Sequence, residues 1–506
     1  MRHFSPDNPK RLARCLPLLS VLLLAALLRF HGLAQDKRFH GDEAYFAAFA
    51  RSAALNGAWM LPGALDKTPL TLYAMAFSMH FAARGSSDTL LDFDARQGEF
   101  AARVPNTFAS LLLVAVIYAL TQRLYRDRRA ALLAALLAAL SPALLAFSAT
   151  AFTDMGMLLC MTLALYLAAA RRPLAAGLWL GLAFASKQQA LFYLPLIALW
   201  LYPSGWRALL RFAQPLALVW ALLLLWDAAR GETTGIFALA AEHNSPAGLM
   251  PLTEIGARLA LWLHYAAALL GPPALTLAFT LWVFWSWRKR FSRTTVLFGL
   301  FIMAYSALHI LFGFNLYDRY LLVIAPLCIV LTAHALAPTA RGMSGRSRLS
   351  LSGVWRRFTI GGRILLLVLL VLAGTALLAE AWTASAGLIE FGGARTDSGI
   401  LALADFLNAQ TLGAIVYDRW LGWELNYYLG QWTDKRKVYY PTPALLLEGA
   451  LAQPEPAPRY FVAPLNYPYQ TYLDVLAQAG FAITLVYAAA PFRVYRLIPP
   501  WANSGV

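Results

Sequence analysis

The chain has 506 residues, of which 60% are hydrophobic and 13% charged, and its formal net charge is +16. Soluble globular domains carry about twice this share of charged residues, so the composition excludes an ordinary soluble protein and is typical of an integral membrane protein. The positive charge lies in short clusters between apolar runs and forms no continuous stretch, which argues against a nucleic-acid-binding face.

The first predicted element is an apolar run at residues 15–30 that follows four basic residues. Secretory signal peptides share this pattern, but no small-residue cleavage site follows it, which favours a retained membrane span. Ten further apolar runs are long enough, or nearly so, for the roughly 20 residues that cross a bilayer. They are centred near residues 113, 139, 163, 181, 196, 220, 272, 303, 329 and 373.

The basic clusters indicate how eleven spans would be oriented. If the N-terminus is cytoplasmic, the predicted inner segments hold 22 cations and two acids, whereas all other positions hold 20 cations and 24 acids. Cytoplasmic loops of membrane proteins are enriched in Lys and Arg. The sequence therefore predicts a multi-pass protein of the cytoplasmic (inner) membrane that contacts membrane lipids and no nucleic acid. Its N-terminus and a linker at 339–363 would be cytoplasmic, and its C-terminal region extracytoplasmic.

Two predicted outer segments are too long to be simple connections. The first, at about 31–103, has an apolar pattern of helical period after Asp42, typical of an amphipathic helix on the membrane surface, and a second short helix is expected near 88–100. The second outer segment contains helical stretches that alternate with short β-type runs at 414–417, 437–440, 460–463 and 482–487. We therefore expect a membrane module at 1–382 and a small extracytoplasmic α/β domain at 383–506.

Four short polar motifs follow one another at predicted outer positions. They are Asp42-Glu43, then Asp66-Lys67-Thr68-Pro69-Leu70, then Glu99-Phe100-Ala101-Ala102-Arg103-Val104-Pro105, and finally Thr153-Asp154. An ionised Asp154 near the hydrocarbon would cost roughly 2.5 to 3.5 kcal/mol unless it faces a polar cavity. Alternatively, Thr153 or Asp154 caps the helix that follows. Arg103 and Arg319 suit either an anionic ligand or lipid headgroups.

These residue types suit the transfer of a sugar from a lipid phosphate. The phosphate leaves as a stable anion, which requires positive charge nearby, and Lys67, Arg103 or Arg319 can supply it. The acceptor hydroxyl loses a proton as it attacks, so a carboxylate is needed on the other side of the anomeric carbon. A single displacement of this kind predicts inversion at that carbon.

The order of these motifs resembles the GT-C glycosyltransferases of the protein O-mannosyltransferase and aminoarabinose–lipid A transferase type. The resemblance covers about residues 15–200, and Asn315–Leu321 is similar to a late outer-loop segment of these enzymes. It implies a polytopic α-helical, GT-C-like membrane protein with about 11 transmembrane helices and amphipathic juxtamembrane helices in the first outer loop. It also implies a polyprenyl-phosphate-linked sugar donor and an active site at the outer membrane surface.

The resemblance also implies roles for particular residues. Asp42 matches the acid thought to act as general base, with Glu43 beside it, and Asp154 matches the second acid of the site. Lys67 matches the residue placed against the donor phosphate. Further candidates for phosphate binding are Arg103, Tyr317 and Arg319.

An acid just before the phosphate-binding lysine can share a divalent metal ion with a later histidine in the aminoarabinose enzymes. Asp66 and His243 would be the corresponding pair here. Two departures weaken the case for an aminoarabinose substrate: Ala44-Tyr45 stands where those enzymes have Thr-Arg, and Thr68 stands where they have proline. A Trp-Trp-Asp motif, typical of oligosaccharyltransferases, does not occur in the sequence.

The function predicted from the sequence is that of an inverting glycosyltransferase. It would move a monosaccharide to a hydroxyl or phosphate of a lipid, glycan or protein acceptor. The alternative is a multi-pass transporter or flippase of a lipid-linked sugar or another envelope precursor. Transporters often place charged groups near the bilayer midplane and consist of two related halves. In this chain the acids and cations of the four motifs lie together at one predicted face, and no second half mirrors the first.

Overall fold

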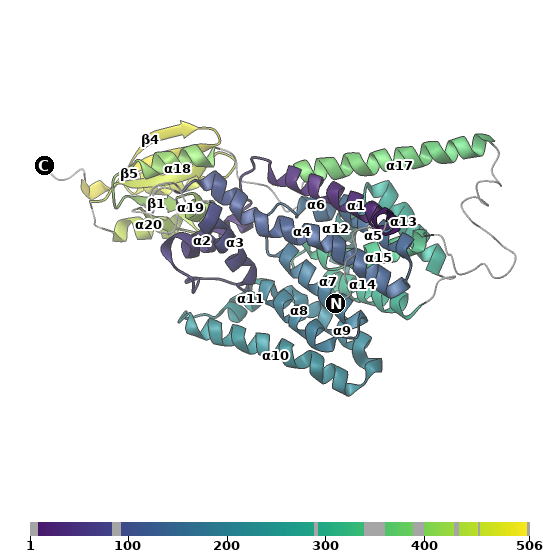
Figure 1. Ribbon diagram of the computed structural model, residues 1–506. Helices are drawn as coiled ribbons and strands as arrows, with labels where there is room; N and C mark the ends of the chain where they lie inside the picture. The colour runs from purple at the N-terminus through teal and green to yellow at the C-terminus, as the bar shows by residue number, and fades with distance from the viewer. Residues whose placement is uncertain are drawn as a thin grey trace. The chain divides into compact units, whose positions relative to one another are not determined.

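The computed structural model of the chain describes residues 9–82, 93–287, 292–337, 360–387, 399–429, 435–453 and 456–502 (Figure 1). The chain forms two compact units. Unit 1 comprises residues 1–35, 62–74 and 103–392, and unit 2 comprises residues 36–61, 75–102 and 393–506. Most of the first predicted outer segment therefore groups with the C-terminal residues. The predicted linker at 339–363 lies almost wholly outside the described residues.

Unit 1 is built from helices whose bounds follow the apolar runs of the sequence. They are α1 (Pro9–Leu33), α5 (Arg128–Leu140), α6 (Pro142–Ala146), α7 (Asp154–Ala169), α8 (Pro173–Ser186), η1 (Gln188–Phe192), α9 (Tyr193–Leu201), η2 (Tyr202–Ser204), α10 (Trp206–Ala229), α11 (Ile236–Asn244), α12 (Leu252–Ala267), α13 (Pro273–Trp287), α14 (Arg293–Leu311), η3 (Asp318–Val323), α15 (Ala325–Leu336) and α17 (Ile360–Ala386). Two further helices, α3 (Leu70–Ala82) and α4 (Ala95–Tyr125), have residues in both units.

Five helical segments among the described residues are long and apolar enough to cross a membrane. They are Cys15–Leu33, Ala95–Tyr125, Trp206–Ala229, Arg293–Leu311 and Leu367–Ala386. Shorter apolar helices occur at Leu70–Ala82, Asp154–Ala169, Pro173–Ser186, Pro273–Ser286 and Ala325–Leu336. These segments support a multi-pass membrane protein, while the count of about eleven spans and their orientation stay predictions.

The apolar run expected near residue 272 is two helices instead of one span. The break between α12 and α13 falls at Gly271-Pro272-Pro273, where Gly271 has a φ of 153°. Helix α12 already ends at Ala267, and Gly271 and Pro272 disfavour a continuous helix across the break, because a positive φ is not helical and proline lacks a backbone donor. A similar break follows α5, where the Ser141 hydroxyl donates to the Leu269 carbonyl at 2.6 Å and accepts from the Leu144 amide.

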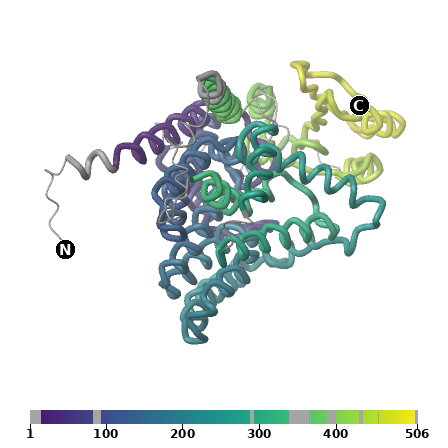
Figure 2. Tube along the Cα trace, turned by 90° about the vertical axis from the view of Figure 1, so that its right-hand side faces the viewer, coloured from purple at the N-terminus to yellow at the C-terminus, as the bar shows by residue number. Residues whose placement is uncertain are grey.

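Helix α8 packs against α7 and against α10, and the three helices lie side by side in Figure 1. Glycine makes the approach to α10 close. A Cβ on Gly177 would lie 1.9 Å from the Phe212 carbonyl oxygen, and one on Gly181 would lie 2.9 Å from Val219. Small residues of this kind let helix backbones approach each other in membrane proteins. Helix α1 packs beside α17 in the same unit, as Figure 2 also shows.

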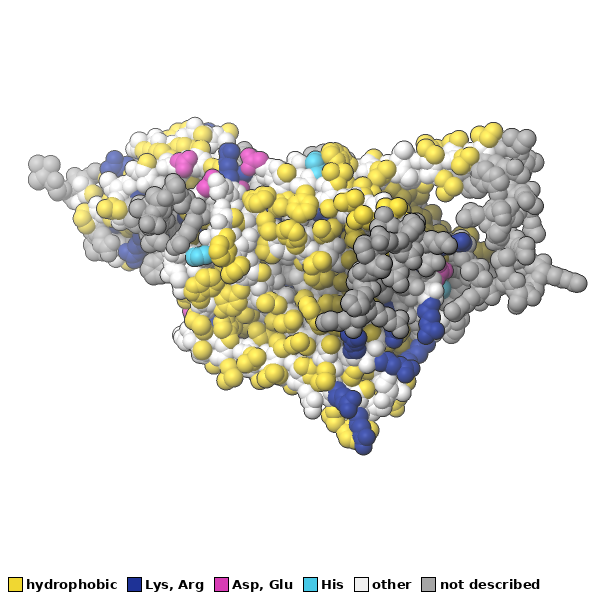
Figure 3. Space-filling view, in the orientation of Figure 1, with side chains coloured by type: hydrophobic (Ala, Val, Ile, Leu, Met, Phe, Trp, Pro, Cys, Tyr) yellow, Lys and Arg dark blue, Asp and Glu magenta, His cyan; other side chains and the backbone are white. Residues whose placement is uncertain are grey.

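The helices of unit 1 expose a broad hydrophobic surface, as expected for a protein solvated by lipid. Figure 3 shows hydrophobic side chains over much of the face turned to the viewer, and Lys and Arg side chains gathered at its lower right end. Exposed leucines on α10, such as Leu218, Leu222 and Leu225, belong to this apolar surface of the unit. An exposed apolar area of this extent on a soluble monomer would be unusual.

Unit 2 contains a five-stranded sheet in the order β2-β1-β3-β5-β4. Its strands are β1 (Ile415–Asp418), β2 (Arg436–Tyr439), β3 (Arg459–Pro464), β4 (Ala482–Ala489) and β5 (Phe492–Ile498). Strand β1 pairs in parallel with β2 and β3, whereas β5 pairs antiparallel with β3 and β4. The four β-type runs of the sequence correspond to β1 to β4. Strand β5 was not predicted.

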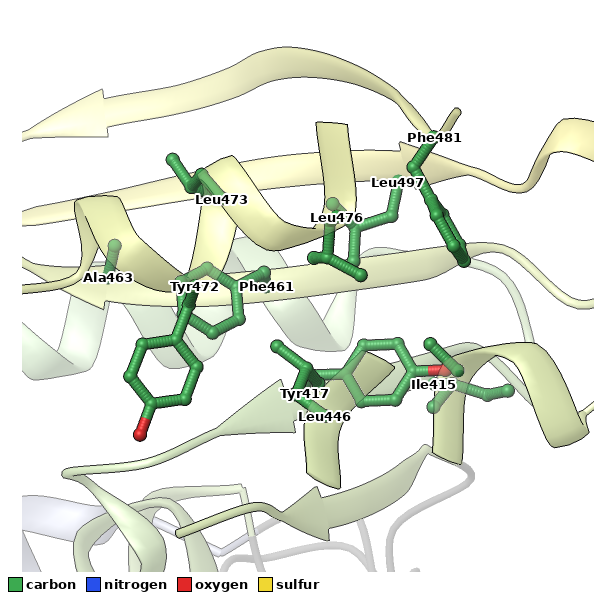
Figure 4. Close-up of a cluster of buried hydrophobic side chains, with 11 residues drawn as sticks. Ile415, Tyr417, Leu446, Phe461, Ala463, Tyr472, Leu473, Leu476, Phe481 and Leu497 are labelled. Carbon is green, nitrogen blue, oxygen red and sulfur yellow. The ribbon is translucent and has the colours of Figure 1, made fainter. Parts of the chain in front are cut away.

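Helices cover the sheet of unit 2. They include α18 (Ile400–Asn408), α19 (Gly422–Tyr428), α20 (Pro443–Ala452) and α21 (Gln470–Gln478), with the 3-10 helix η4 (Pro500–Ala502) after β5. Leu446 of α20 and Leu473 and Leu476 of α21 share a buried core with Tyr417 and Phe461 of the strands (Figure 4). This core gives the small α/β layer its own hydrophobic interior.

Helix α2 (Gly41–Asn56) packs on α19 within unit 2. The Tyr45 ring lies 4.4 Å from the Trp423 ring, and Phe46 and Phe49 are 3% and 2% exposed. The apolar face that the sequence predicted to rest on the membrane is therefore covered by protein, because α19 supplies aromatic partners for it. The second helix expected near 88–100 falls partly on residues outside the described set, and α4 begins at Ala95.

Candidate active site

Lys67 lies in a short connection before α3 and forms an ion pair with Asp66. The Asp66 side chain is 8% exposed, and its Oδ2 lies 3.3 Å from Nδ1 of His243 on α11. The neighbouring Thr68 donates a buried hydrogen bond to the Phe184 carbonyl of α8 at 2.7 Å. This bond fixes the segment against unit 1, so the threonine that replaces a proline of the related motif has a structural role. The structure thus brings Asp66, Lys67 and His243 together.

Asp154 opens α7 and is almost fully buried, at 1% exposure. Its Oδ1 accepts a hydrogen bond from Lys187 Nζ at 2.6 Å, and Lys187 directly follows α8. The preceding Thr153 makes no side-chain capping bond. Asp154 therefore faces a charged partner inside the helical unit, which offsets the cost of burying its carboxylate.

Lys187 was missed as a site residue by sequence reasoning. The available signal was a lone cation between the apolar runs centred near residues 181 and 196. A lysine in such a segment is costly unless a partner or a polar cavity accommodates it. Here the partner is Asp154, and the charges of Arg319 and Lys67 also act on the Lys187 ammonium.

Arg319 belongs to η3, which leads into α15 at Ala325-Pro326. Its guanidinium lies 4.9 Å from the ring centre of Tyr317 and 5.1 Å from that of Phe152. These cation–π contacts hold the guanidinium between two aromatic rings. The late outer-loop motif is therefore placed beside the Asp154–Lys187 pair.

A cavity of about 340 Å³ lies within unit 1, where these segments meet. Its lining combines two ammonium groups, amides and aromatic rings: Lys67, Lys187, Gln188, Gln189, Leu191, Phe192, Ala240, Asn244, His309, Phe314, Asn315 and Tyr320. Gln188 also donates to the Asp66 carbonyl at 2.9 Å, which ties η1 to the segment that carries Lys67. A concave, largely apolar pocket with a few convergent polar groups is the usual form of a ligand site.

Asp42 and Glu43 belong to unit 2, where they open α2. The Glu43 carboxylate accepts from the His40 amide at 3.0 Å, and the Asp42 amide donates to His40 Nδ1 at 3.1 Å. This arrangement is a capping box in which histidine takes the place of Ser or Thr. Glu43 is fully buried, so its carboxylate has a structural role in starting the helix. Asp42 is only partly buried.

The two charged residues of the Glu-x-x-x-Arg motif, at the start of α4, belong to different units. Glu99 is 2% exposed, pairs with Arg38 at 2.8 Å and accepts a hydrogen bond from the Tyr428 hydroxyl of α19. It thereby ties the first outer segment to the C-terminal domain within unit 2. Arg103, in unit 1, is 3% exposed, which does not suit a lipid-headgroup contact, and it is not among the residues that line the cavity.

The proposed divalent metal site has few ligands. Asp66 and His243 approach each other, but no group of three His, Cys, Asp or Glu side chains suited to a metal occurs among the described residues. Zinc sites generally use three or four protein ligands. The Lys67 ammonium also contacts Asp66 Oδ2, the carboxylate oxygen near His243, and would compete with a metal ion bound there. These residues do not fit a tightly held metal ion.

Comparisons with known proteins agree with this architecture. Residues 93–229 match the family described as dolichyl-phosphate-mannose-protein mannosyltransferase. ArnT from Cupriavidus metallidurans bound to undecaprenyl phosphate is 17% identical with a TM-score of 0.63, and the match covers 95% of this chain and 97% of that chain. The same protein in the apo state is 15% identical with a TM-score of 0.62 and the same coverage.

Another solved structure with a similar fold is the oligosaccharyltransferase of Archaeoglobus fulgidus in its apo form. It is 13% identical with a TM-score of 0.54, and the match covers 95% of this chain and 75% of that chain. No curated protein matched the chain by sequence. The resemblance expected from the motifs is confirmed, and the chain has the GT-C fold of these membrane glycosyltransferases.

Proposed function

We propose that this protein is an inverting glycosyltransferase. It moves a monosaccharide from a polyprenyl-phosphate donor to a hydroxyl or phosphate of a lipid, glycan or protein acceptor at the outer face of the cytoplasmic membrane. The observation that carries the proposal is the placement of Lys67 and Lys187 on one cavity, each with its own carboxylate partner.

This charge arrangement suits a ligand that brings negative charge. Each lysine forms a neutral pair with an aspartate, so the two buried ammonium groups are tolerated before any donor binds. Arg319 adds a positive charge that acts on Lys187. As the sugar–phosphate bond breaks, negative charge grows on the departing phosphate. Fixed cations in a largely apolar cavity stabilise that charge more than water does, because they need not reorganise.

The two candidate acids take different roles in this proposal. Asp154 is held by Lys187 at 2.6 Å, so it serves to position the lysine that contacts the phosphate. Asp42 is assigned the proton of the acceptor, as the resemblance implies, because a carboxylate can act as the general base for an attacking hydroxyl. Glu43 is committed to the capping box and does not receive the proton.

The decisive experiment follows the sugar. Purified protein in lipid nanodiscs is incubated with labelled polyprenyl-phosphate sugars and a membrane extract as acceptor source, and the label is traced into product. Asp42→Asn removes the base and should lower the transfer rate by about 10² to 10⁴. Donor binding in that variant should stay native.

Lys67 is tested in the same assay. Lys67→Ala should weaken donor binding, and Lys67→Arg should rescue it only in part, because a planar guanidinium does not reproduce a compact ammonium. Lys37→Ala, a change at another lysine of the first outer segment, serves as the matched control and should transfer at the native rate. Native transfer by Asp42→Asn would contradict the proposal, and so would movement of the labelled donor across the membrane of proteoliposomes without any transfer.

A further inference from the structure

A second cavity lies in unit 2, at the carboxyl ends of two parallel strands. It measures about 140 Å³ and is lined by Asp418, Gly422, Leu425, Asn426, Lys437, Val438 and Tyr439. Asp418 and Tyr439 are the last residues of β1 and β2, and they are register partners. Ligands of parallel α/β sheets bind outside the carboxyl ends of the strands. The chemistry assigned to unit 1 makes no use of this cavity.

Asp418 has one carboxylate oxygen in use and one without a partner. Oδ1 accepts from the Trp420 and Leu421 amides at 3.0 and 2.9 Å, which stabilises the turn after β1. Oδ2 is buried and has no hydrogen-bond partner among the described residues. Burial raises the pKa of Asp418 to about 6, against the opposing effect of the backbone donors. An unpartnered buried acceptor of this kind is rare and costly, so it points to a group that the cavity receives.

The other polar side chains of the cavity can each donate a hydrogen bond. Lys437 lies on β2, where burial lowers its pKa to about 7 and the nearby Asp418 carboxylate opposes that shift, while Asn426 comes from α19. Tyr439 contributes a half-exposed ring whose hydroxyl accepts from Arg419. Glycine at 422 keeps the space open, since a Cβ there would lie 3.7 Å from Asp418 Oδ2 and 3.9 Å from the Tyr439 ring.

The mixture of charges selects the class of ligand. A phosphate or carboxylate would meet the Asp418 carboxylate, and a metal ion would meet the Lys437 ammonium, so both are disfavoured. A neutral ligand with adjacent hydroxyls can donate to Asp418 Oδ2 and accept from Lys437 and Asn426 at once. Because a water molecule occupies about 30 Å³ in the liquid, the cavity has room for roughly five water molecules, which is close to the size of one pyranose ring.

We propose that this pocket of the C-terminal domain binds one neutral sugar unit of the acceptor, so that the acceptor is a glycan or a glycolipid. The inference that the acceptor is a glycan or a glycolipid rests on the proposed function. The inference that the pocket binds a sugar does not. Asp418 Oδ2 and Lys437 hold neighbouring hydroxyls, and Tyr439 packs on the ring.

The test is a direct titration. Full-length protein in nanodiscs prepared without glycoside detergents is titrated with methyl α-D-mannopyranoside, methyl α-D-glucopyranoside and methyl α-D-galactopyranoside, and saturation-transfer NMR follows binding. At least one glycoside should bind. Asp418→Asn, which keeps the Oδ1 contacts and removes the free acceptor, should weaken it about 10- to 100-fold. Gly422→Ala, which fills the space beside Oδ2, should weaken it as well.

Two controls make the outcome decisive. Asp474→Asn, at an exposed acid of α21 in the same unit, should bind like the native protein. Inorganic phosphate at the same concentrations should neither bind nor compete. The proposal is overturned if no glycoside binds, if Asp418→Asn and Gly422→Ala bind as the native protein does, or if phosphate displaces the glycoside. Label transfer from the polyprenyl-phosphate donor is measured separately, so a failure of the proposed function is distinguished from a failure of this pocket.

Discussion

Replacing Lys187 and Asp154 singly and together separates their structural role from phosphate binding. The two side chains are 8% and 2% exposed and meet at 2.6 Å. Lys187→Met leaves the Asp154 carboxylate buried without its ammonium, and Asp154→Asn leaves the ammonium without its carboxylate. Breaking a buried ion pair in this way costs about 3 to 5 kcal/mol, whereas replacing both charges by neutral groups of similar size is often close to neutral.

The double variant Lys187→Met/Asp154→Asn is therefore the informative one. It should unfold near the native temperature, while each single variant unfolds at a lower temperature. If Lys187 contacts the donor phosphate, the double variant also loses a hydrogen bond to a charged group. Such a bond contributes about 1.5 to 3 kcal/mol, which corresponds to about 10- to 150-fold in Kd.

The assay combines thermal unfolding in detergent with binding of undecaprenyl phosphate by native mass spectrometry. Asp154→Asn serves as the comparison, because it keeps the Lys187 side chain and removes only the carboxylate that positions it, so it should weaken phosphate binding less than the double variant does at temperatures where it is folded. The reasoning is refuted if the double variant is stable and binds undecaprenyl phosphate as tightly as the native protein. In that case Lys187 would serve only to neutralise Asp154.

Three further predictions concern unit 2 and the topology. Asp418→Asn should stabilise the protein at pH 7.5 by up to about 3 kcal/mol, because burial raises the pKa of Asp418 from 3.8 to about 6. Ionising this carboxylate above pH 6 costs stability, so the gain should shrink as pH falls from 6 to 4, and equal gains in unfolding scans at pH 7.5 and 4.5 would contradict it. Tyr428→Phe removes a donor to the buried Glu99 carboxylate and should cost about 1 to 3 kcal/mol in the same scans, a loss that a native unfolding temperature would disprove. Reporter fusions after residue 345 should be active in the cytoplasm and those after residue 400 outside it, and the reverse pattern would exclude the predicted orientation.

Local properties of the sequence were sufficient to predict the class of protein and much of its fold. Apolar run length and clustered arginines indicate membrane helices because the bilayer acts on each segment separately. The alternation of short β-type and helical stretches predicted the C-terminal α/β domain, with strands β1 to β4 placed where expected. Strand β5 was missed, since Phe492–Ile498 lies only two residues after β4.

The motifs near Lys67 and Asp154 could be recognised in the sequence, but their partners could not. His243 reaches Asp66 across 177 residues, and Lys187 reaches Asp154 across 33. Such pairs depend on how α7, α8 and α11 pack, which no local periodicity specifies. A lysine that lines a cavity and a lysine that merely separates two apolar runs have the same hydropathy. Only the tertiary structure could therefore show that Lys187 belongs to the site.

The assignment of apolar faces was likewise decided by the tertiary structure. The pattern after Asp42 predicts that one side of α2 avoids water, and burial of Phe46 and Phe49 confirms that it does. Lipid and protein are equally apolar neighbours for such a face, so the sequence alone cannot choose between them. In the structure the neighbour is protein: α19 places the Trp423 ring against Tyr45 within the same unit, although Trp423 lies more than 370 positions later in the chain.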